Sequence, residues 1–206
     1  MEASFFVRHP VLKDLFGLII FILCVVIGTL LINTFIFRTF SVVGPSMENT
    51  LHTGDRLIVN RLPVTVANLT GKTYIPERGQ IIVFKNPGWI DGQPDEYIVK
   101  RVIGLPGEHV TLKDGKFTVY NTQHPNGFNP DDYNNGEPMS PTSGEGDWVV
   151  PDGMIFVSGD HRVGTYSYDS RNGLGFIPSY DIIGSVSFRI YPLNKVRGFL
   201  NEGTSY

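Results

Sequence analysis

The longest apolar segment of the chain lies near its N-terminus. After a short mixed-charge tail over residues 1–14, no charged residue occurs from Leu15 to Phe37, a span of 23 residues. About 20 apolar residues cross the hydrocarbon core of a bilayer as a helix, so the segment predicts a transmembrane helix. Two alternatives stay open. One is a buried helix of a soluble domain; the other is a cleavable signal peptide, whose apolar region is usually about 7–15 residues long and ends in a small-residue cleavage site.

Beyond this segment the pattern of apolar and polar positions is typical of β-strands. The run from Ile81 to Phe84 is continuously apolar, which favours a strand buried on both faces. A hairpin is expected over 110–120, with Asp114-Gly115 at its tip. Further strands are predicted at 55–60, 96–103, 154–158 and 182–191.

The segments between these strands are rich in turn-forming residues. Residues 63–80 are predicted to be loop, and 88–95 a hairpin connection. Residues 121–147 are rich in Asn, Pro, Gly and Asp, and predict a long surface excursion or part of a small subdomain. The expected fold class is mostly β, with an N-terminal single transmembrane helix followed by a largely antiparallel β domain over 38–206.

Composition narrows the possible functions. The chain is 41% hydrophobic and 18% charged, which is typical of a globular protein. Its net charge of −3, with no long basic run, implies no nucleic-acid partner. Cys24 is the single cysteine, so an intrachain disulfide and a thiolate metal site are both excluded. We expect neither a metal nor another cofactor.

The first candidate for chemistry is Ser46. Phe40, Val42 and Val43 are compatible with a short strand, and Gly44-Pro45 then predicts a turn, because Gly permits unusual backbone angles and Pro fixes its own φ. A hydroxyl directly after such a turn can be presented on a rigid support. The alternative is that Ser46 is an ordinary turn residue.

The second candidate is Lys100 in the predicted strand 96–103. Side chains alternate along a strand, so Ile98, Lys100 and Val102 share one face. Apolar surroundings favour the neutral amine, which can accept a proton from a serine hydroxyl. The alternative is an edge strand from which Lys100 reaches water. Arg101 cannot be the base, because a guanidinium does not deprotonate in proteins.

The third candidate segment runs from Ser158 to Arg171 and gathers polar and charged residues directly after an apolar strand. Asp160 and Asp169 can accept hydrogen bonds from nearby arginines, and such pairs would fix loop geometry beside a site. The candidate donors are Arg101, Arg162 and Arg171. A solvated loop explains the same residues without chemistry.

Together these segments resemble the bacterial type I signal peptidases, the membrane-anchored serine proteases that remove signal peptides from exported proteins. Gly44–Leu51 is similar to the nucleophile box of that family, Tyr97–Glu108 to its lysine box, and Gly159–Arg171 to its last box. Gly54–Asn60 is similar to the box that follows the nucleophile. The motifs span about residues 40 to 175, in the family's order and behind an apolar anchor.

The resemblance implies the signal-peptidase β fold and a Ser/Lys mechanism. Ser46 would be the nucleophile and Lys100 the general base. The implied supporting residues are Ser167, Asp169, Asp160, Arg101 and Arg171. The positions that match substrate-lining ones are Phe40, Val42 and Leu51, for which ordinary core packing is the alternative.

The resemblance also implies partners and location. The substrates would be signal-peptide-bearing preproteins, cut after small residues in an Ala-X-Ala-like pattern. The protein would cross the cell membrane once, with residues 1–14 in the cytoplasm and the catalytic domain on the extracytoplasmic side. The charges flanking the apolar segment do not by themselves decide this orientation, and the oligomeric state is not predicted.

Three positions depart from the family pattern. Asn49 stands where Pro is usual, and His161 where Asn is usual. Val163–Tyr166 lengthens the spacing between Arg162 and Ser167. In addition, Gly44 has no hydroxyl at the position where some relatives supply a second donor to the oxyanion.

Other functions are compatible with parts of the sequence. A Ser-His-Asp hydrolase would use one of four histidines, none of which lies in a recognisable triad context: His52, His109, His124 and His161. A self-cleaving Ser-Lys repressor-type protease shares the two residues but has no membrane anchor. From a different class, the chain could be an inactive membrane-anchored β module that binds exported proteins.

Overall fold

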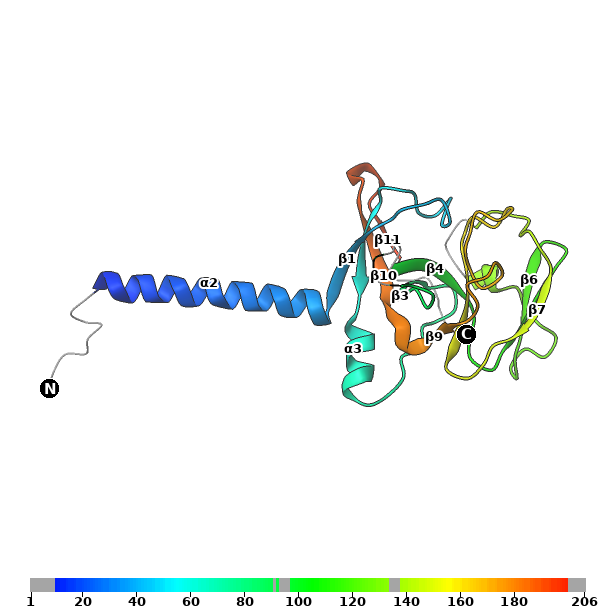
Figure 1. The fold of residues 1–206 in the computed structure, drawn as a ribbon, viewed down its shortest axis with the longest axis horizontal. Helices are drawn as coiled ribbons and strands as arrows, with labels where there is room; N and C mark the ends of the chain where they lie inside the picture. Colours follow the sequence, from blue (N-terminus) through cyan, green and yellow to red (C-terminus); the bar gives the residue numbers. More distant parts are fainter. Residues whose placement is uncertain (1–9, 91, 93–96, 134–137, 200–206) are drawn as a thin grey trace.

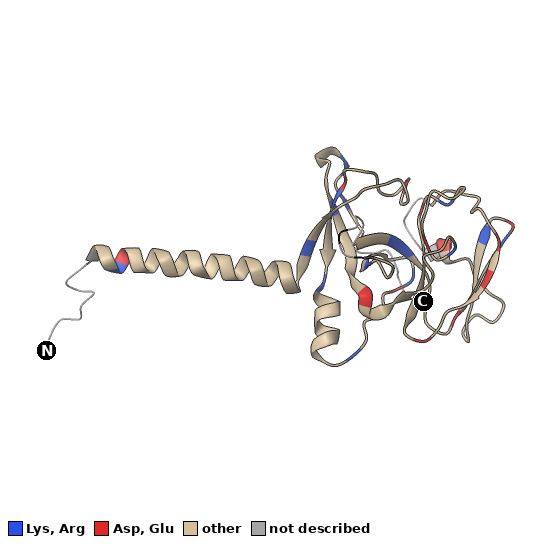
Figure 2. Cartoon of the chain, in the orientation of Figure 1, with Lys and Arg blue, Asp and Glu red and all other residues tan. Residues whose placement is uncertain are grey.

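A long N-terminal helix projects away from the rest of the molecule. The computed structural model describes residues 10–90, 92, 97–133 and 138–199. Helix α2 (Pro10–Phe35) is the described helix that is long and apolar enough to cross a membrane (Figure 1). Its charged residues lie near its start, and the remainder is uncharged (Figure 2). No part of this span is buried inside the described structure, so the alternative of a buried helix of a soluble domain is wrong.

The main body is an antiparallel sheet. Its hydrogen-bonded order is β1-β2-β10-β3-β4-β8-β9, with β11 also paired to β10. These strands are β1 (Phe37–Ser41), β2 (Arg56–Asn60), β3 (Ile81–Lys85), β4 (Tyr97–Gly104), β8 (Met154–Ser158), β9 (Ile177–Pro178), β10 (Ile182–Tyr191) and β11 (Arg197–Gly198). The predicted mostly β, largely antiparallel fold class is confirmed. The chain enters β1 almost directly from α2, since Phe37 belongs to the strand rather than to the helix.

A second, smaller sheet lies beside the first. It has the order β6-β5-β7, from β5 (His109–Lys113), β6 (Lys116–Tyr120) and β7 (Gly146–Val149). The predicted hairpin over 110–120 is confirmed by the antiparallel pairing of β5 with β6. The described part of 121–147 contains a 3₁₀ turn at Pro130–Tyr133 and the start of β7, so this excursion contributes to the small sheet.

The hydrophobic core follows the predicted strands. All four residues from Ile81 to Phe84 are buried, as the continuous apolar run of β3 predicts. Between the two sheets, Phe156 lies fully buried, with ring centroids 6.0, 5.0 and 6.2 Å from those of Phe117, Trp148 and Phe176. This aromatic cluster joins β8 to the small sheet.

The prediction of loop over 63–80 is wrong at its beginning. Helix α3 (Leu62–Leu69) forms there. Pro63 is tolerated in the first turn of a helix, where its missing N–H would have no intrahelical partner. The start of α3 is tied to the end of α2, since the Arg61 N–H donates to Ile36 O at 2.7 Å and the Thr65 hydroxyl to Phe35 O at 2.8 Å. Two further 3₁₀ turns lie at Ser179–Asp181 and Leu193–Lys195.

The aromatic cluster yields a stability prediction. Phe156→Ala removes a fully buried ring, and it is expected to lower the free energy of unfolding by about 3–5 kcal/mol. Chemical denaturation of the full chain in detergent measures this. Val149→Ala, at a 66% exposed position of β7, is the control and should change the free energy by less than about 0.5 kcal/mol. Equal effects of the two substitutions would contradict the assignment of Phe156 to a packed core.

Candidate active site

Ser46 lies in a compact turn that follows β1. Gly44 adopts φ +90°, which favours glycine, and its N–H donates to the Thr53 hydroxyl at 3.1 Å. The Glu48 N–H donates to Pro45 O at 3.0 Å, and the Leu51 N–H to Met47 O at 2.8 Å. Met47 and Leu51 are fully buried, so their side chains attach the turn to the hydrophobic core.

Lys100 lies in the middle of β4 and is buried, with 3% of its surface exposed. Its Nζ lies 2.8 Å from Ser46 Oγ and 2.9 Å from Val99 O. The alternative in which this side chain extends from an edge strand into water is therefore wrong. Burial removes the water that would stabilise an ammonium, which favours the neutral amine. A neutral amine that donates one N–H to Val99 O has a lone pair for the Ser46 hydroxyl.

Asp160 joins the three segments that were singled out in the sequence. Arg101, on β4, donates from Nε at 2.8 Å and from Nη2 at 2.7 Å to its two carboxylate oxygens. The Thr50 hydroxyl, four residues after Ser46, donates to the same carboxylate. All of these side chains are buried. Burial raises the pKa of Asp160, but the charge and hydrogen bonds of Arg101 outweigh that effect, and the pKa lies below its ordinary value.

Asp169 holds the other end of the loop after β8. Its carboxylate accepts from Arg171 Nη2 at 2.8 Å and from the Gly159 N–H at 2.9 Å. Burial raises the pKa of Asp169, but the hydrogen bonds and charge of Arg171 outweigh that effect. The pKa of Asp169 therefore lies below its ordinary value. Asp160 and Asp169 thus have separate arginine partners, Arg101 and Arg171.

Ser167 is fully buried and lies close to the Ser46 turn. Its hydroxyl has no partner at hydrogen-bond distance among the described residues, yet it lies near enough to the Asp169 carboxylate to help lower the pKa of that group. A Cβ on Gly159 would overlap both the Ser167 hydroxyl and the Ser46 carbonyl oxygen. Gly159 is therefore the point at which the loop passes directly against the nucleophile turn.

A groove of about 840 Å³ runs past Ser46 and Lys100. Phe40 and Val42 are among its lining residues. Leu51 is instead fully buried in the core beside Met47, so we correct its assignment as a substrate-contacting residue. The turn returns its side chain to the same core cluster as that of Met47.

Other groove residues were missed by the sequence reasoning. They include Val43, Tyr97, Val99, Tyr166 and Tyr168. For Tyr166 and Tyr168 a signal was present, because they flank Ser167. Ser167 is buried, and both of its neighbours line the groove, with exposed fractions of 63% and 50%.

Arg162 connects the excursion to this site. It is fully buried, donates from Nε to Gly159 O at 2.7 Å, and forms a two-point ion pair with Asp131 at 2.9 and 2.8 Å. The Ser143 N–H also donates to Arg162 O at 2.8 Å. The segment around residues 121–147 therefore packs over the loop that carries Asp160.

Among the described residues, no histidine is hydrogen-bonded to the Ser46 hydroxyl, so none forms a triad with it. His161 lies beside the turn, but its Nδ1 contacts Pro45 O and Glu48 rather than the Ser46 hydroxyl. His109 bonds Asp147 in the small sheet, at 2.7 Å. Within the described residues, no group of three or more His, Cys, Asp or Glu side chains gathers in a metal-binding arrangement.

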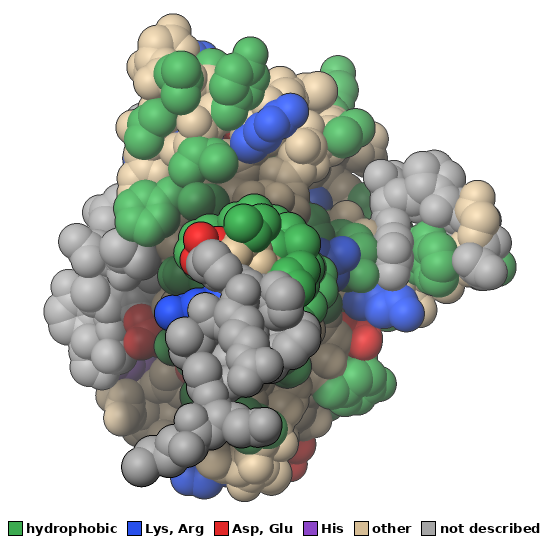
Figure 3. Space-filling model, turned by 90° about the vertical axis from the view of Figure 1, so that its left-hand side faces the viewer, with side chains coloured by type: hydrophobic (Ala, Val, Ile, Leu, Met, Phe, Trp, Pro, Cys, Tyr) green, Lys and Arg blue, Asp and Glu red, His purple; other side chains and the backbone are tan. Residues whose placement is uncertain are grey.

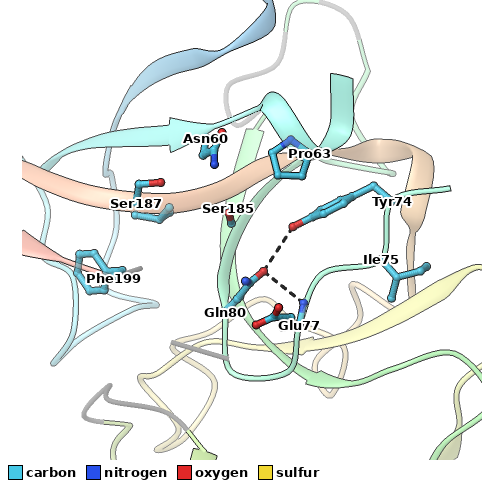
Figure 4. Close-up of a pocket in the computed structure, with 10 residues that line it drawn as sticks. Asn60, Pro63, Tyr74, Ile75, Glu77, Gln80, Ser185, Ser187 and Phe199 are labelled. Carbon is cyan, nitrogen blue, oxygen red and sulfur yellow. Dashed lines mark hydrogen bonds between the residues drawn. The ribbon is translucent and has the colours of Figure 1, made fainter. Parts of the chain in front are cut away.

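A smaller pocket of about 270 Å³ lies between β2, β10 and the segment after α3 (Figure 4). Tyr74, Gln80 and Ser185 are among its lining residues, and the Tyr74 hydroxyl donates to Gln80 Oε1 at 3.4 Å. None of the catalytic, supporting or substrate-lining residues predicted from the sequence lines it. Of these two hollows, the larger groove is the one that Ser46 and Lys100 line.

Known proteins match this chain over the segments that form the site. The family model described as "Signal peptidase, peptidase S26" matches residues 13–191. Signal peptidase I of Bacillus licheniformis is 34% identical over 188 residues, which cover 90% of this chain and 93% of that one. Signal peptidase I T of Bacillus subtilis (strain 168) is 36% identical over 179 residues, 85% of either chain. The crystal structure of a signal peptidase I from Enterococcus faecalis V583 is 27% identical, covers 56% of this chain and all of that one, and aligns with a TM-score of 0.40.

The buried pair of Asp160 with Arg101 predicts a pH-dependent stability. Because folding lowers the pKa of Asp160, its contribution is fully present above the unfolded pKa of about 4 and is lost as the pH falls through the lower, folded value. Asp160→Asn is expected to cost about 3–5 kcal/mol at neutral pH, since it removes the carboxylate charge that pairs with the buried Arg101 guanidinium. It should also flatten the acid limb of stability against pH.

Denaturant titrations between pH 2 and pH 7 measure both effects. Asp147→Asn, whose side chain is 67% exposed, is the matched control and should change the free energy of unfolding by less than about 0.5 kcal/mol. Folding also lowers the pKa of Asp169, so the stability of Asp160→Asn should still fall to some extent at low pH. An unchanged acid limb in this variant would contradict the prediction.

Proposed function

The chain belongs to the signal peptidase family, peptidase S26, and we propose that it is a membrane-anchored serine endopeptidase that cleaves signal peptides from exported preproteins. In this proposal Ser46 is the nucleophile and Lys100 the general base. The observation that carries it is the 2.8 Å contact between Lys100 Nζ and Ser46 Oγ, formed by a lysine with only 3% of its surface exposed.

The proposed reaction is acyl transfer. Lys100 takes the proton of the Ser46 hydroxyl as Oγ attacks the scissile carbonyl carbon and forms a tetrahedral intermediate. Collapse of this intermediate breaks the C–N bond, and the Lys100 ammonium returns the proton to the leaving amine. A water molecule, deprotonated by the same amine, then hydrolyses the ester and releases the signal peptide with Ser46 restored.

The charge that develops on the carbonyl oxygen needs a donor aimed at it. We assign the Ser46 N–H to this role, because it moves with the attacking residue and lies in an anchored turn. Gly44 has no side-chain hydroxyl and cannot supply a second donor. Such donors typically contribute about 10²–10³ in rate.

The groove supports an extended substrate with small side chains near the cut. Its floor includes the apolar side chains of Phe40, Val42 and Val99, and Val42 and Leu57 are almost fully buried. A floor made of packed core residues leaves shallow depressions rather than deep pockets. We therefore propose that residues of the Ala-X-Ala type precede the scissile bond.

Membrane anchoring is supported by α2 and the face from which it projects. Hydrophobic side chains are exposed on that face of the β domain, viewed along α2 (Figure 3). Helix α3, which adjoins the end of α2, exposes Leu62, Val66 and Leu69, three residues of one helical stripe. A signal peptide is itself held in the bilayer, so anchoring both partners raises their effective concentration.

The inactive β module that binds exported proteins is the second candidate, and a processing assay separates the two. Ser46→Ala and Lys100→Ala are each expected to reduce cleavage of a purified preprotein by at least about 10³-fold, because nucleophile and base act as one unit. Lys113→Ala, at the exposed end of β5, is the control and should process at the wild-type rate. Normal cleavage by either site variant would refute the role of that residue.

Gly159 provides a second, geometric test. Gly159→Ala places a methyl group where the Ser46 carbonyl and the Ser167 hydroxyl now lie, so the loop and the nucleophile turn must separate. Cleavage is expected to fall by about 100-fold, since a displacement of about 1 Å is enough for such a loss. Gly153→Ala, at a turn where a Cβ meets no atom within 4 Å, is the comparison, although its φ of +70° also strains an alanine. Cleavage by Gly159→Ala at or above the rate of Gly153→Ala would contradict the role assigned to the close approach at Gly159.

A further inference from the structure

His161 contacts both peptide groups that flank the Cα atom of Ser46. Its backbone N–H donates to Ser46 O at 3.0 Å, which belongs to the peptide between residues 46 and 47. Its ring Nδ1 lies 3.3 Å from Pro45 O, which belongs to the peptide between residues 45 and 46. One residue of the loop after β8 thus bonds to the peptide groups on both sides of the nucleophile.

These two contacts constrain the backbone of Ser46. A residue's φ and ψ describe how its two flanking peptide planes are rotated, so holding both planes fixes both angles. The plane that contains Pro45 O also contains the Ser46 N–H, which points in the opposite direction. Orienting this carbonyl therefore orients the N–H that is assigned to the developing oxyanion.

The turn has its own bond to the same carbonyl, from the Glu48 N–H at 3.0 Å. That bond closes the turn on itself but does not attach it to the loop that carries Asp160. The His161 ring provides this attachment, because it extends from the loop and is stacked on Tyr166, with centroids 4.6 Å apart and planes inclined by 24°.

The surroundings favour a donor at Nδ1. Glu48 Oε2 lies 3.7 Å from this atom, and Pro45 O can only accept, so both neighbours attract a proton on Nδ1. The side chain is only 14% exposed. A hydrogen on Nδ1 is present both in one neutral tautomer and in the charged imidazolium.

We propose that His161 is a positioning residue, whose Nδ1–H bond to Pro45 O orients the Ser46 N–H toward the oxyanion. The inference rests on the proposed function, since it assigns a role within the same reaction. It concerns the transition state rather than substrate binding, and so it predicts an effect on kcat and not on KM.

Two substitutions isolate the Nδ1 donor. In His161→Asn the amide Nδ2 can occupy the place of Nδ1 and donate to Pro45 O, whereas His161→Phe keeps a ring against Tyr166 and has no donor. For a preprotein substrate, kcat should fall about ten-fold in the Phe variant, the change expected for one lost hydrogen bond, with KM within about two-fold of wild type. The Asn variant should stay within about three-fold of wild type in kcat. His109→Phe, in the small sheet, is the matched control and should leave both constants unchanged.

A readout that needs no activity separates this inference from the proposed function. Hydrogen exchange of residues 44–51, measured on the full chain in detergent, should be faster in His161→Phe than in wild type and unchanged in His161→Asn. If wild type does not cleave preproteins, the proposed function fails, while the exchange result still reports whether His161 holds the turn. If wild type cleaves and the Phe variant matches it in kcat and in exchange, the inference is overturned. Equal losses in the Asn and Phe variants, or a rise in KM alone, would also overturn it.

Discussion

The pleat of β4 is the constraint on which the candidate site depends. Lys100 and Arg101 are consecutive, so their side chains leave the strand on opposite faces. One face presents the amine to Ser46 at 2.8 Å, and the other presents the guanidinium to Asp160 at 2.7 Å. Because Asp160 also accepts from Thr50, the same strand holds both the nucleophile segment and the loop that packs against it. A shift of β4 by one residue would exchange the two faces and lose both contacts.

Buried ion pairs around the site define position more than they add stability. Taking two charges out of water costs about as much as their attraction returns, so a pair such as Arg101 with Asp160 is a poor source of net stability. Removing one partner is nevertheless costly, and that asymmetry enforces one geometry. Arg162 forms a similar ion pair with Asp131 and also donates to Gly159 O. It therefore connects the excursion over 121–147 to the backbone of Gly159. The loop after β8 is thus held from β4, from its own end at Arg171, and from the excursion.

The sequence predicted the features that depend on residues close to one another along the chain. Alternation around Lys100 predicted its apolar setting, and the continuous run at Ile81 to Phe84 predicted a strand buried on both faces. Helix α3 was missed because it is only eight residues long and starts with a proline, a composition that is also typical of loops. Leu51 was misplaced because the irregular turn after Ser46, closed by the bond from the Leu51 N–H to Met47 O, brings this side chain back into the core, and the sequence pattern does not predict that turn. Contacts such as that of Thr50 with Asp160 join residues 110 positions apart, a distance that periodicity alone does not bridge.

The chain order also sets how far the proposed nucleophile can lie from the bilayer. Helix α2 ends at Phe35 and Ser46 follows after one short strand and a turn, so even a fully extended connection would span at most about 40 Å. The connection is not extended, because Gly44 reverses it, and it is not a free linker, because α3 bonds to the last turn of α2. A rigid support of this kind keeps the groove at one height above the proposed membrane surface. Under the proposed function, a substrate segment would have to leave the bilayer at that height to enter the groove, so the anchor would select the cleavage position together with the shape of the groove.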